Sequence, residues 1–249
     1  MRILGKEIVL FSQPGPLDQR EVHWRGADLW RLVGAYFGYS ITAAILLLSI
    51  GVRWRDDSAS LRTVGEALVL AALFCTHSNH RFWPDAAYWQ LRRQDFKRHW
   101  RQGVIWGVGT HLAGVVIRMA TALLAAMLLR TDLSQVESNN PLANAGLGID
   151  WLLFAITAVL LAPLMEELFT RGMLYGWLRR QVGVKKGLII SSLLFAVLHF
   201  NGLGLISFFV TGLLFGALYE RTGSLAPGMI AHATHNLISV VLALALAGA

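Results

Sequence analysis

Apolar residues along this chain gather into long runs that are separated by short polar stretches. Seven such runs can be traced, and most are close to the roughly 20 residues that an α-helix needs to cross a bilayer. They lie at about residues 32–52, 61–76, 104–129, 149–178, 187–200, 204–219 and 227–246. The run at 61–76 is the weakest because it is short and carries Glu66 near its start. The pattern predicts an all-α fold, a polytopic transmembrane helix bundle of about seven spans.

The composition agrees with a membrane bundle. Of the 249 residues, 55% are hydrophobic and only 15% are charged, whereas a soluble domain has about a quarter of its residues charged. Cys75 is the only cysteine, so an internal disulfide and a cysteine zinc cluster are both excluded. The first dozen residues hold too short an apolar stretch for a signal peptide, so we expect the N-terminus to be retained.

The formal charge of +7 is carried by short loops between the apolar runs. A nucleic-acid-binding domain would gather such charge on one soluble face, so we expect no nucleic-acid partner. The stretches 78–102 and 178–186 are basic, whereas 130–150 is acidic, and this alternation predicts a cytoplasmic N-terminus and an external C-terminus. The loop 53–62 fits poorly, because it should lie outside and yet carries three arginines. The compact chain and short loops favour a bacterial inner membrane.

These features divide the chain into three parts. Residues 1–32 are predicted to be a cytoplasmic N-terminal segment, and 33–130 to be N-terminal transmembrane helices with a basic cytoplasmic loop. Residues 149–249 form the third part, a transmembrane core of the last four apolar runs. Within the basic loop, residues 86–100 fit either a helix lying on the inner leaflet or a plain extension of the third span.

Two adjacent carboxylates, Glu166 and Glu167, lie inside the fourth apolar run. A charge at the bilayer centre costs about 2.5–3.5 kcal/mol on insertion scales, so such residues are candidates for function. Glu167 and Arg171 are four residues apart and can pair on one helix face. Glu166 points about 100° away from that face and has no local cation, which suits a general base. Pro163 can bend the helix and free backbone groups nearby.

Two further runs place rare polar groups inside the membrane. His199 ends the fifth run, and His232 and Asn236 lie four apart on one face of the seventh. His235 is one position away from that face, and His111 in the third run is interpreted as a packing residue. Because the polar groups of the three helices reach overlapping depths, we expect Glu166, His199, His232 and Asn236 to share one pocket.

The three polar segments match a known set of motifs. They read EExxxR at Glu166–Arg171, FxxxH at Phe195–His199 and HxxxN at His232–Asn236. In order and spacing they resemble the CPBP family, also called the Abi or CAAX-protease-and-bacteriocin-processing family, over about residues 150–240. The resemblance implies an intramembrane protease with a core made of the last four helices, acting on a membrane protein or peptide near its C-terminal end.

The resemblance also implies roles for the site residues. Glu166 would activate water with the help of His199, while His232 and Asn236 would bind the oxyanion of the tetrahedral intermediate. Glu167 and Arg171 would be the supporting pair. A glutamic mechanism requires no cofactor, but Glu166, His199 and His232 could also form a zinc site, and this alternative stays open.

Other functional classes fit the sequence less well. There is no HExxH helix of a zinc protease and no GxSG serine motif. A non-catalytic membrane scaffold or immunity protein would keep the same residues for packing. A proton-coupled transporter would use the acid and histidines as a relay, but it predicts inverted repeats, and the sequence shows none.

Overall fold

The computed structural model describes a defined subset of the 249 residues. These are residues 2–3, 6–7, 17, 22, 24–49, 90–130, 149–199, 202 and 204–247. The predicted span 61–76 and the loop 53–62 lie outside the described residues, as does most of the acidic loop 130–150. Apart from a two-residue antiparallel pair, β1 (Arg2–Ile3) with β2 (Lys6–Glu7), every described element is helical, which confirms the predicted fold class.

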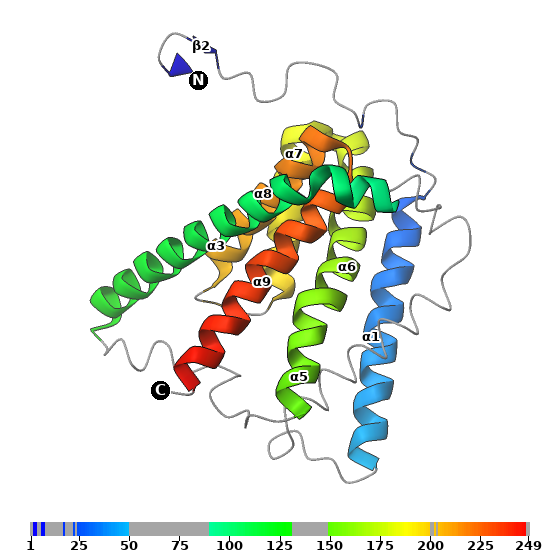
Figure 1. Ribbon diagram of the computed structural model, residues 1–249. Coiled ribbons are helices and arrows are strands. Elements are labelled where there is room, and N and C mark those ends of the chain that lie inside the picture. The colour runs from blue at the N-terminus through cyan, green and yellow to red at the C-terminus, as the bar shows by residue number, and fades with distance from the viewer. Residues whose placement is uncertain are drawn as a thin grey trace.

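The helices follow the predicted apolar runs with shifted ends (Figure 1). They are α1 (Gly26–Ser49), α3 (Arg93–Leu129), α8 (Leu205–Thr222), α9 (Leu225–Ala247) and a long composite run. The composite run consists of α5 (Ile149–Ile156), η1 (Thr157–Leu161), α6 (Ala162–Glu167), η2 (Leu168–Tyr175) and α7 (Gly176–Leu198), where η marks π-helix.

A sharp turn at Gly183 divides α7 into two legs. The residue has φ +81°, a conformation that favours glycine because it has no Cβ. Beyond it the chain folds back, and a Cβ added at Gly187 would lie 3.1 Å from the backbone nitrogen of Arg179. The predicted spans 149–178 and 187–200 are therefore a helical hairpin, and the basic loop predicted at 178–186 is reduced to this turn.

Helix ends extend beyond the apolar runs where a polar residue caps the helix. Asp95 accepts a hydrogen bond of 2.8 Å from the backbone nitrogen of Arg92, so α3 begins at Arg93 and not near residue 104. Asp28 likewise accepts from the backbone nitrogen of Arg25, and α1 begins at Gly26. From Arg93 onward the basic stretch is thus an extension of the third span, one of the two alternatives that the sequence left open.

Apolar side chains face outward along these helices, as expected in lipid. Ile105, Leu112 and Val116 of α3 are each at least 60% exposed. Among the described residues, four stretches are long and apolar enough to cross a membrane: Arg93–Leu128, Phe154–Leu198, Leu205–Thr222 and Leu225–Ala245. The protein is an integral membrane protein, and the total of seven spans stays a prediction.

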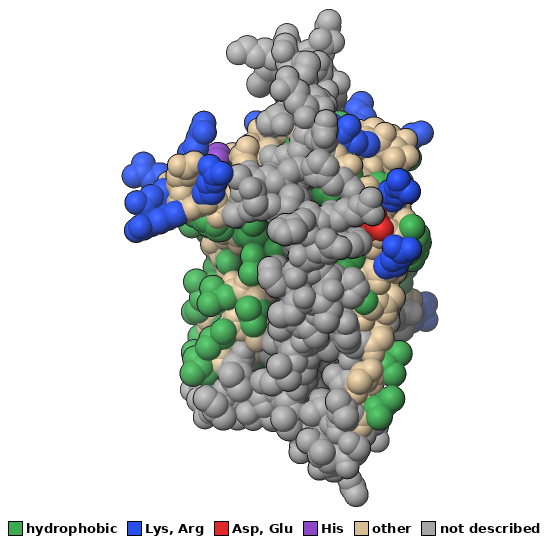
Figure 2. Space-filling view, turned by 90° about the vertical axis from the view of Figure 1, so that its right-hand side faces the viewer, with side chains coloured by type: hydrophobic (Ala, Val, Ile, Leu, Met, Phe, Trp, Pro, Cys, Tyr) green, Lys and Arg blue, Asp and Glu red, His purple; other side chains and the backbone are tan. Residues whose placement is uncertain are grey.

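Basic side chains gather toward one end of the molecule (Figure 2). The backbone carbonyl of Gln90, just before α3, accepts a 3.0 Å hydrogen bond from Ser224, just before α9. Arg179, near the Gly183 turn, pairs with Glu220 at the end of α8 at 2.7 Å. These contacts place the starts of α3 and α9, the turn in α7 and the end of α8 on the same side.

Glycines allow α3 to pack directly on α9. A Cβ at Gly103 would come within 2.6 Å of Ile230, and one at Gly107 within 2.5 Å of the carbonyl oxygen of Ala231. Such small residues spaced four apart let transmembrane helices approach closely. The helix α9, which carries His232 and Asn236, is therefore held in place by a helix from the N-terminal half of the chain.

Candidate active site

Two wide helical turns flank the adjacent carboxylates. Glu166 and Glu167 end the short α6, which lies between the π-helical segments η1 and η2. Such π-turns in helices are frequent at functional sites. In η1 the backbone N–H of Ala162 donates to Thr157, five residues earlier. The pattern ends there because the next donor in the series would be Pro163, which has no N–H.

Glu167 is buried, and one of its carboxylate oxygens contacts both Arg171 and His232. Its Oε1 lies 2.9 Å from Nη1 of Arg171 and 3.0 Å from Nδ1 of His232. The predicted pair of Glu167 and Arg171 is thus formed. Glu167 and His232 are joined as well, a contact that the sequence did not suggest. Oε2 of Glu167 lies beside Gly228, where a Cβ would be only 3.2 Å away.

Arg171 is buried between aromatic rings. Its guanidinium lies 4.4 Å from the ring centre of Phe195 and 5.4 Å from that of Phe215. It also donates to the hydroxyl of Thr170 at 2.7 Å and to the carbonyl of Gly212 at 3.3 Å. A flat guanidinium suits this combination of stacking and directed hydrogen bonds.

Glu166 faces the two histidines. Its Oε2 lies 3.8 Å from Nε2 of His199 and 3.8 Å from Nε2 of His232. The Glu166 side chain is 34% exposed, yet Oε2 itself is buried without a hydrogen-bond partner among the described residues. The three groups therefore converge at a separation that is too long for direct hydrogen bonds.

Each histidine is held by its Nδ1 atom. Nδ1 of His199 lies 2.7 Å from the carbonyl oxygen of Phe195, and the ring stacks on Phe208 at 4.1 Å. Nδ1 of His232 contacts Glu167, as described above. A carbonyl and a carboxylate only accept hydrogen bonds, so Nδ1 carries the proton in both rings. In the neutral rings, the two Nε2 atoms that face Glu166 are then acceptors.

All four predicted residues line one cavity of about 240 Å³. Its remaining wall is a mixture of aromatic, small and polar side chains: Phe154, Ala158, Phe195, Phe208, Thr211, His235, Ser239 and Val240. Asn236 differs from the other three because its Nδ2 donates to the backbone carbonyl of Ala158 at 2.7 Å. The structure thus brings Glu166, His199 and His232 face to face and ties Asn236 to η1.

A second polar group borders the cavity on the α3 side. The rings of His111 and His235 are 5.2 Å apart, and Ser239 lies 3.4 Å from Nδ1 of His111. Ser239 also donates to the backbone carbonyl of His235 at 3.1 Å. His111 is 5% exposed, in agreement with the packing role expected from the sequence.

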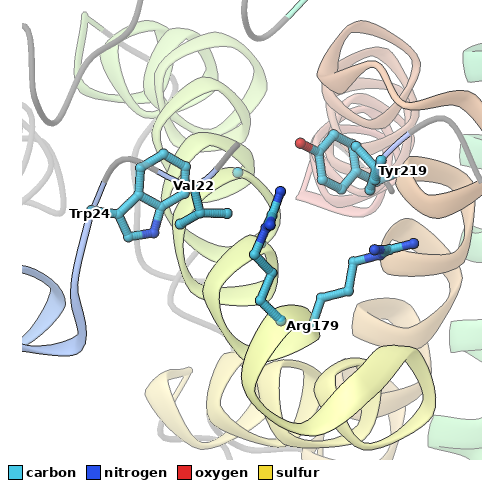
Figure 3. A pocket seen from close by; sticks show the side chains of 8 residues that line it. Val22, Trp24, Arg179 and Tyr219 are labelled. Carbon is cyan, nitrogen blue, oxygen red and sulfur yellow. The ribbon is translucent and has the colours of Figure 1, made fainter. Parts of the chain in front are cut away.

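The small cavity in Figure 3 lies elsewhere, where the N-terminal segment meets η2 and α7. It measures about 20 Å³ and is lined by Val22, Trp24, Arg179 and Tyr219 among others. Trp24 donates to the carbonyl of Met173 at 2.9 Å, and Arg179 is paired with Glu220. This cavity holds none of the predicted site residues and is a packing defect at the basic end of the bundle.

As placed, the acid and the two histidines do not form a ready metal site. Among the described residues, no group of three or more His, Cys, Asp and Glu side chains is arranged to hold an ion. The donor set would suit zinc by type, and the Nδ1 contacts resemble those that orient metal-bound histidines.

Several contributors to this site could not be found from the sequence. Phe208 and Phe215 look like any lipid-facing aromatic until the fold places them beside His199 and Arg171. The carbonyl of Ala158 becomes a partner for Asn236 only because of the register of η1. Pro163 was the one signal in the sequence that pointed to freed backbone groups in this helix.

Comparison with known proteins agrees with this geometry. Residues 148–238 match the family model described as type II CAAX prenyl endopeptidase Rce1-like. This segment is similar to that family. It contains Glu166, Glu167, Arg171, His199, His232 and Asn236, so all six predicted site residues fall inside the match. The match supports a CAAX-type intramembrane protease, whereas α1 and α3 lie outside it.

One relative covers more of the chain than the Rce1-like segment. An uncharacterized protein of Mycoplasma capricolum subsp. capricolum is 25% identical over 240 residues, which cover 86% of this chain and 68% of the relative. No solved structure gave a significant match. The activity of the chain therefore has to be argued from the Rce1-like segment and from the site itself.

Proposed function

We propose that this chain is an intramembrane endopeptidase that hydrolyses a peptide bond of a membrane-associated or C-terminally tagged protein. The observation that carries the proposal is the position of Oε2 of Glu166, 3.8 Å from Nε2 of both His199 and His232. Atoms at this separation can be bridged by one water molecule. The cavity beside them, about 240 Å³, has room for that water and for a peptide segment.

In this mechanism Glu166 is the general base. The water donates one hydrogen bond to Oε2 of Glu166 and one to an Nε2 acceptor, which leaves a lone pair directed into the cavity. As the water oxygen bonds to the carbonyl carbon, its proton passes to Glu166. Glu166 then gives that proton to the amide nitrogen as the C–N bond breaks. The products are a carboxylic acid, which ionises to the carboxylate, and an amine, which takes up the released proton.

The oxyanion is met by donors on α9. An asparagine amide has two N–H groups, and Asn236 uses one of them on Ala158, so the second can donate to the substrate carbonyl. His232 can donate from Nε2 when its ring is protonated, and Glu167 on the opposite nitrogen would stabilise that positive charge. His199, fixed by Phe195 and Phe208, holds the water.

The substrate class follows from the surroundings of the site. The cavity lies among helices that are apolar enough to span a bilayer, so a substrate has to reach it from the membrane. The Rce1-like match suggests which substrate to test first: a protein or peptide that ends in a CAAX-type sequence, with or without a prenyl group. We further propose a bacterial inner membrane location with the N-terminus in the cytoplasm.

Replacement of the proposed base tests the hydrolase. The variant Glu166→Gln should keep the unfolding midpoint of the wild type, while cleavage should fall by about 100-fold or more. The assay uses the purified protein in proteoliposomes, with membrane-anchored peptides ending in a prenylated or unprenylated CAAX sequence and the products identified by mass spectrometry. Asp95→Asn makes the same chemical change at the start of α3, away from the cavity, and should keep activity.

If Glu166→Gln cleaves as fast as the wild type, Glu166 is not the base. If neither protein cleaves any of the peptides, the scaffold interpretation gains. The metal alternative is tested separately with a chelator. On the proposed glutamic mechanism, dialysis against EDTA leaves the rate unchanged. Loss of activity on dialysis and recovery with zinc would instead make Glu166, His199 and His232 metal ligands.

A further inference from the structure

Pro163 leaves one backbone carbonyl of the catalytic helix without a helical donor. In η1 the N–H of Ala162, which would serve Ala158 in an α-helix, donates to Thr157. The next bond of the π pattern would run from residue 163 to Ala158, and proline has no N–H. The carbonyl of Ala158 instead accepts from Nδ2 of Asn236 on α9 at 2.7 Å.

This hydrogen bond bears on the direction in which Glu166 points. A π-turn adds one residue to a helical turn and so rotates everything after it by about 100° relative to an unbroken α-helix. Glu166 lies only three residues after Pro163, on the segment that is rotated in this way. A freed carbonyl inside a membrane bundle needs a donor, and Ala158, which lines the cavity, takes that donor from Asn236, so the wide turn is less stable without this side chain.

We propose that Asn236 is a positioning residue for Glu166, acting through Ala158. Its side chain stabilises the wide turn that aims the carboxylate at His199 and His232, and this role is distinct from any contact with the oxyanion. The proposal rests on the proposed function for its consequence in catalysis, but the hydrogen bond itself can be tested without activity.

A double-mutant cycle on stability tests the hydrogen bond. The variant Asn236→Ala should lower the thermal unfolding midpoint in detergent micelles, because Ala158 loses its partner. Pro163→Ala supplies an N–H at position 163, so the helix can satisfy Ala158 by itself. In the Pro163→Ala background, Asn236→Ala should therefore lower the midpoint by clearly less than in the wild type, which is the signature of coupled sites.

Thr211→Ala is the matched control, because Thr211 also lines the cavity but lies on α8, away from Ala158. Its effect on the midpoint should be the same in both backgrounds. The proposal is overturned if Asn236→Ala leaves the midpoint unchanged, or if its full effect persists beside Pro163→Ala. Both outcomes are read from unfolding curves, so they stand whether or not the chain proves to be a protease.

Kinetics then separate positioning from a purely structural role. If Asn236 aims the base, Asn236→Ala should lower kcat by about 100-fold with KM nearly unchanged, the loss expected from a small misplacement of a reacting group. In the Pro163→Ala background, Asn236→Ala should lower kcat by clearly less than in the wild type, because only the proposed oxyanion contact is then removed. An equal loss of kcat in both backgrounds would assign Asn236 to the oxyanion only and would refute the positioning role.

Discussion

Glu166 and Glu167 are neighbours with identical side chains, but the fold gives them opposite environments. Glu167 is 1% exposed and bridges Arg171 and His232, whereas Glu166 is 34% exposed and faces two Nε2 atoms across 3.8 Å. The direction of each side chain follows from the helix, since consecutive residues point about 100° apart. One acid therefore belongs to the packing of the core and the other to the cavity.

Replacing each acid with glutamine should change the thermal unfolding midpoint by different amounts, because the two acids lie in different environments. Glu167→Gln leaves the buried Arg171 without its counter-charge, and breaking a buried pair costs about 3–5 kcal/mol. We expect a large fall in the thermal unfolding midpoint. Glu166→Gln removes no ion pair with a permanent cation, and its midpoint should stay close to that of the wild type. Equal midpoints for the two variants would contradict this division.

The same residue scale shows what could be predicted from sequence. The spacing of Glu167 and Arg171 was enough to predict their pair, because a helix places residues four apart on one face. The bond from His232 to Glu167 was not predictable, since it depends on how α9 crosses α6. The contact of Asn236 with Ala158 required the register of η1, which follows from Pro163 but is not visible in hydropathy.

At the scale of elements, the contact of α3 with α9 extends the site beyond the Rce1-like segment. The helix α9 carries His232 and Asn236, and its outer face lies on the glycines of α3. Hydropathy predicted both helices but not that they pack together, because a hydropathy profile does not show which apolar helices are in contact. The reversal of the chain between 178 and 187 was predicted, but the sequence placed a loop there, whereas the structure continues the helix on both sides of Gly183.

Filling the space at Gly107 should loosen this contact. In Gly107→Ala the new Cβ would lie 2.5 Å from the carbonyl oxygen of Ala231 and 2.6 Å from Thr234, so α9 has to move. Overpacking of this kind costs about 1–3 kcal/mol. We expect a lower unfolding midpoint and slower cleavage, measured in the same proteoliposome assay.

Gly109→Ala is the matched control on the same helix. Among the described residues, no atom beyond the adjoining residues and the backbone of the same helix lies within 4 Å of a Cβ placed there. Because alanine is the better helix former, this variant should be as stable as the wild type or slightly more stable. A Gly107→Ala protein that unfolds at the wild-type temperature would show that the close approach of α3 and α9 is not required.

For the whole molecule, the orientation of the bundle in the membrane can be argued from its helix contacts together with its charge distribution. The starts of α3 and α9, the turn at Gly183 and the end of α8 lie on one side, and that side collects most of the basic residues in Figure 2. For the proposed bacterial inner-membrane location, the positive-inside rule predicts that this end is cytoplasmic. The opposite side then holds the end of α7 near Gly202 and the C-terminal end of α9.

Cysteine labelling tests this orientation. In a Cys75→Ser background, Lys186→Cys next to the turn and Gly202→Cys at the opposite end both place a thiol at an exposed position. A membrane-impermeant maleimide added to spheroplasts should label Gly202→Cys and spare Lys186→Cys, and inside-out vesicles should reverse the result. Both variants should react fully in detergent, which controls for buried thiols. Labelling of Lys186→Cys from outside would invert the bundle and place the site, and any substrate tail that enters it, on the other face of the membrane.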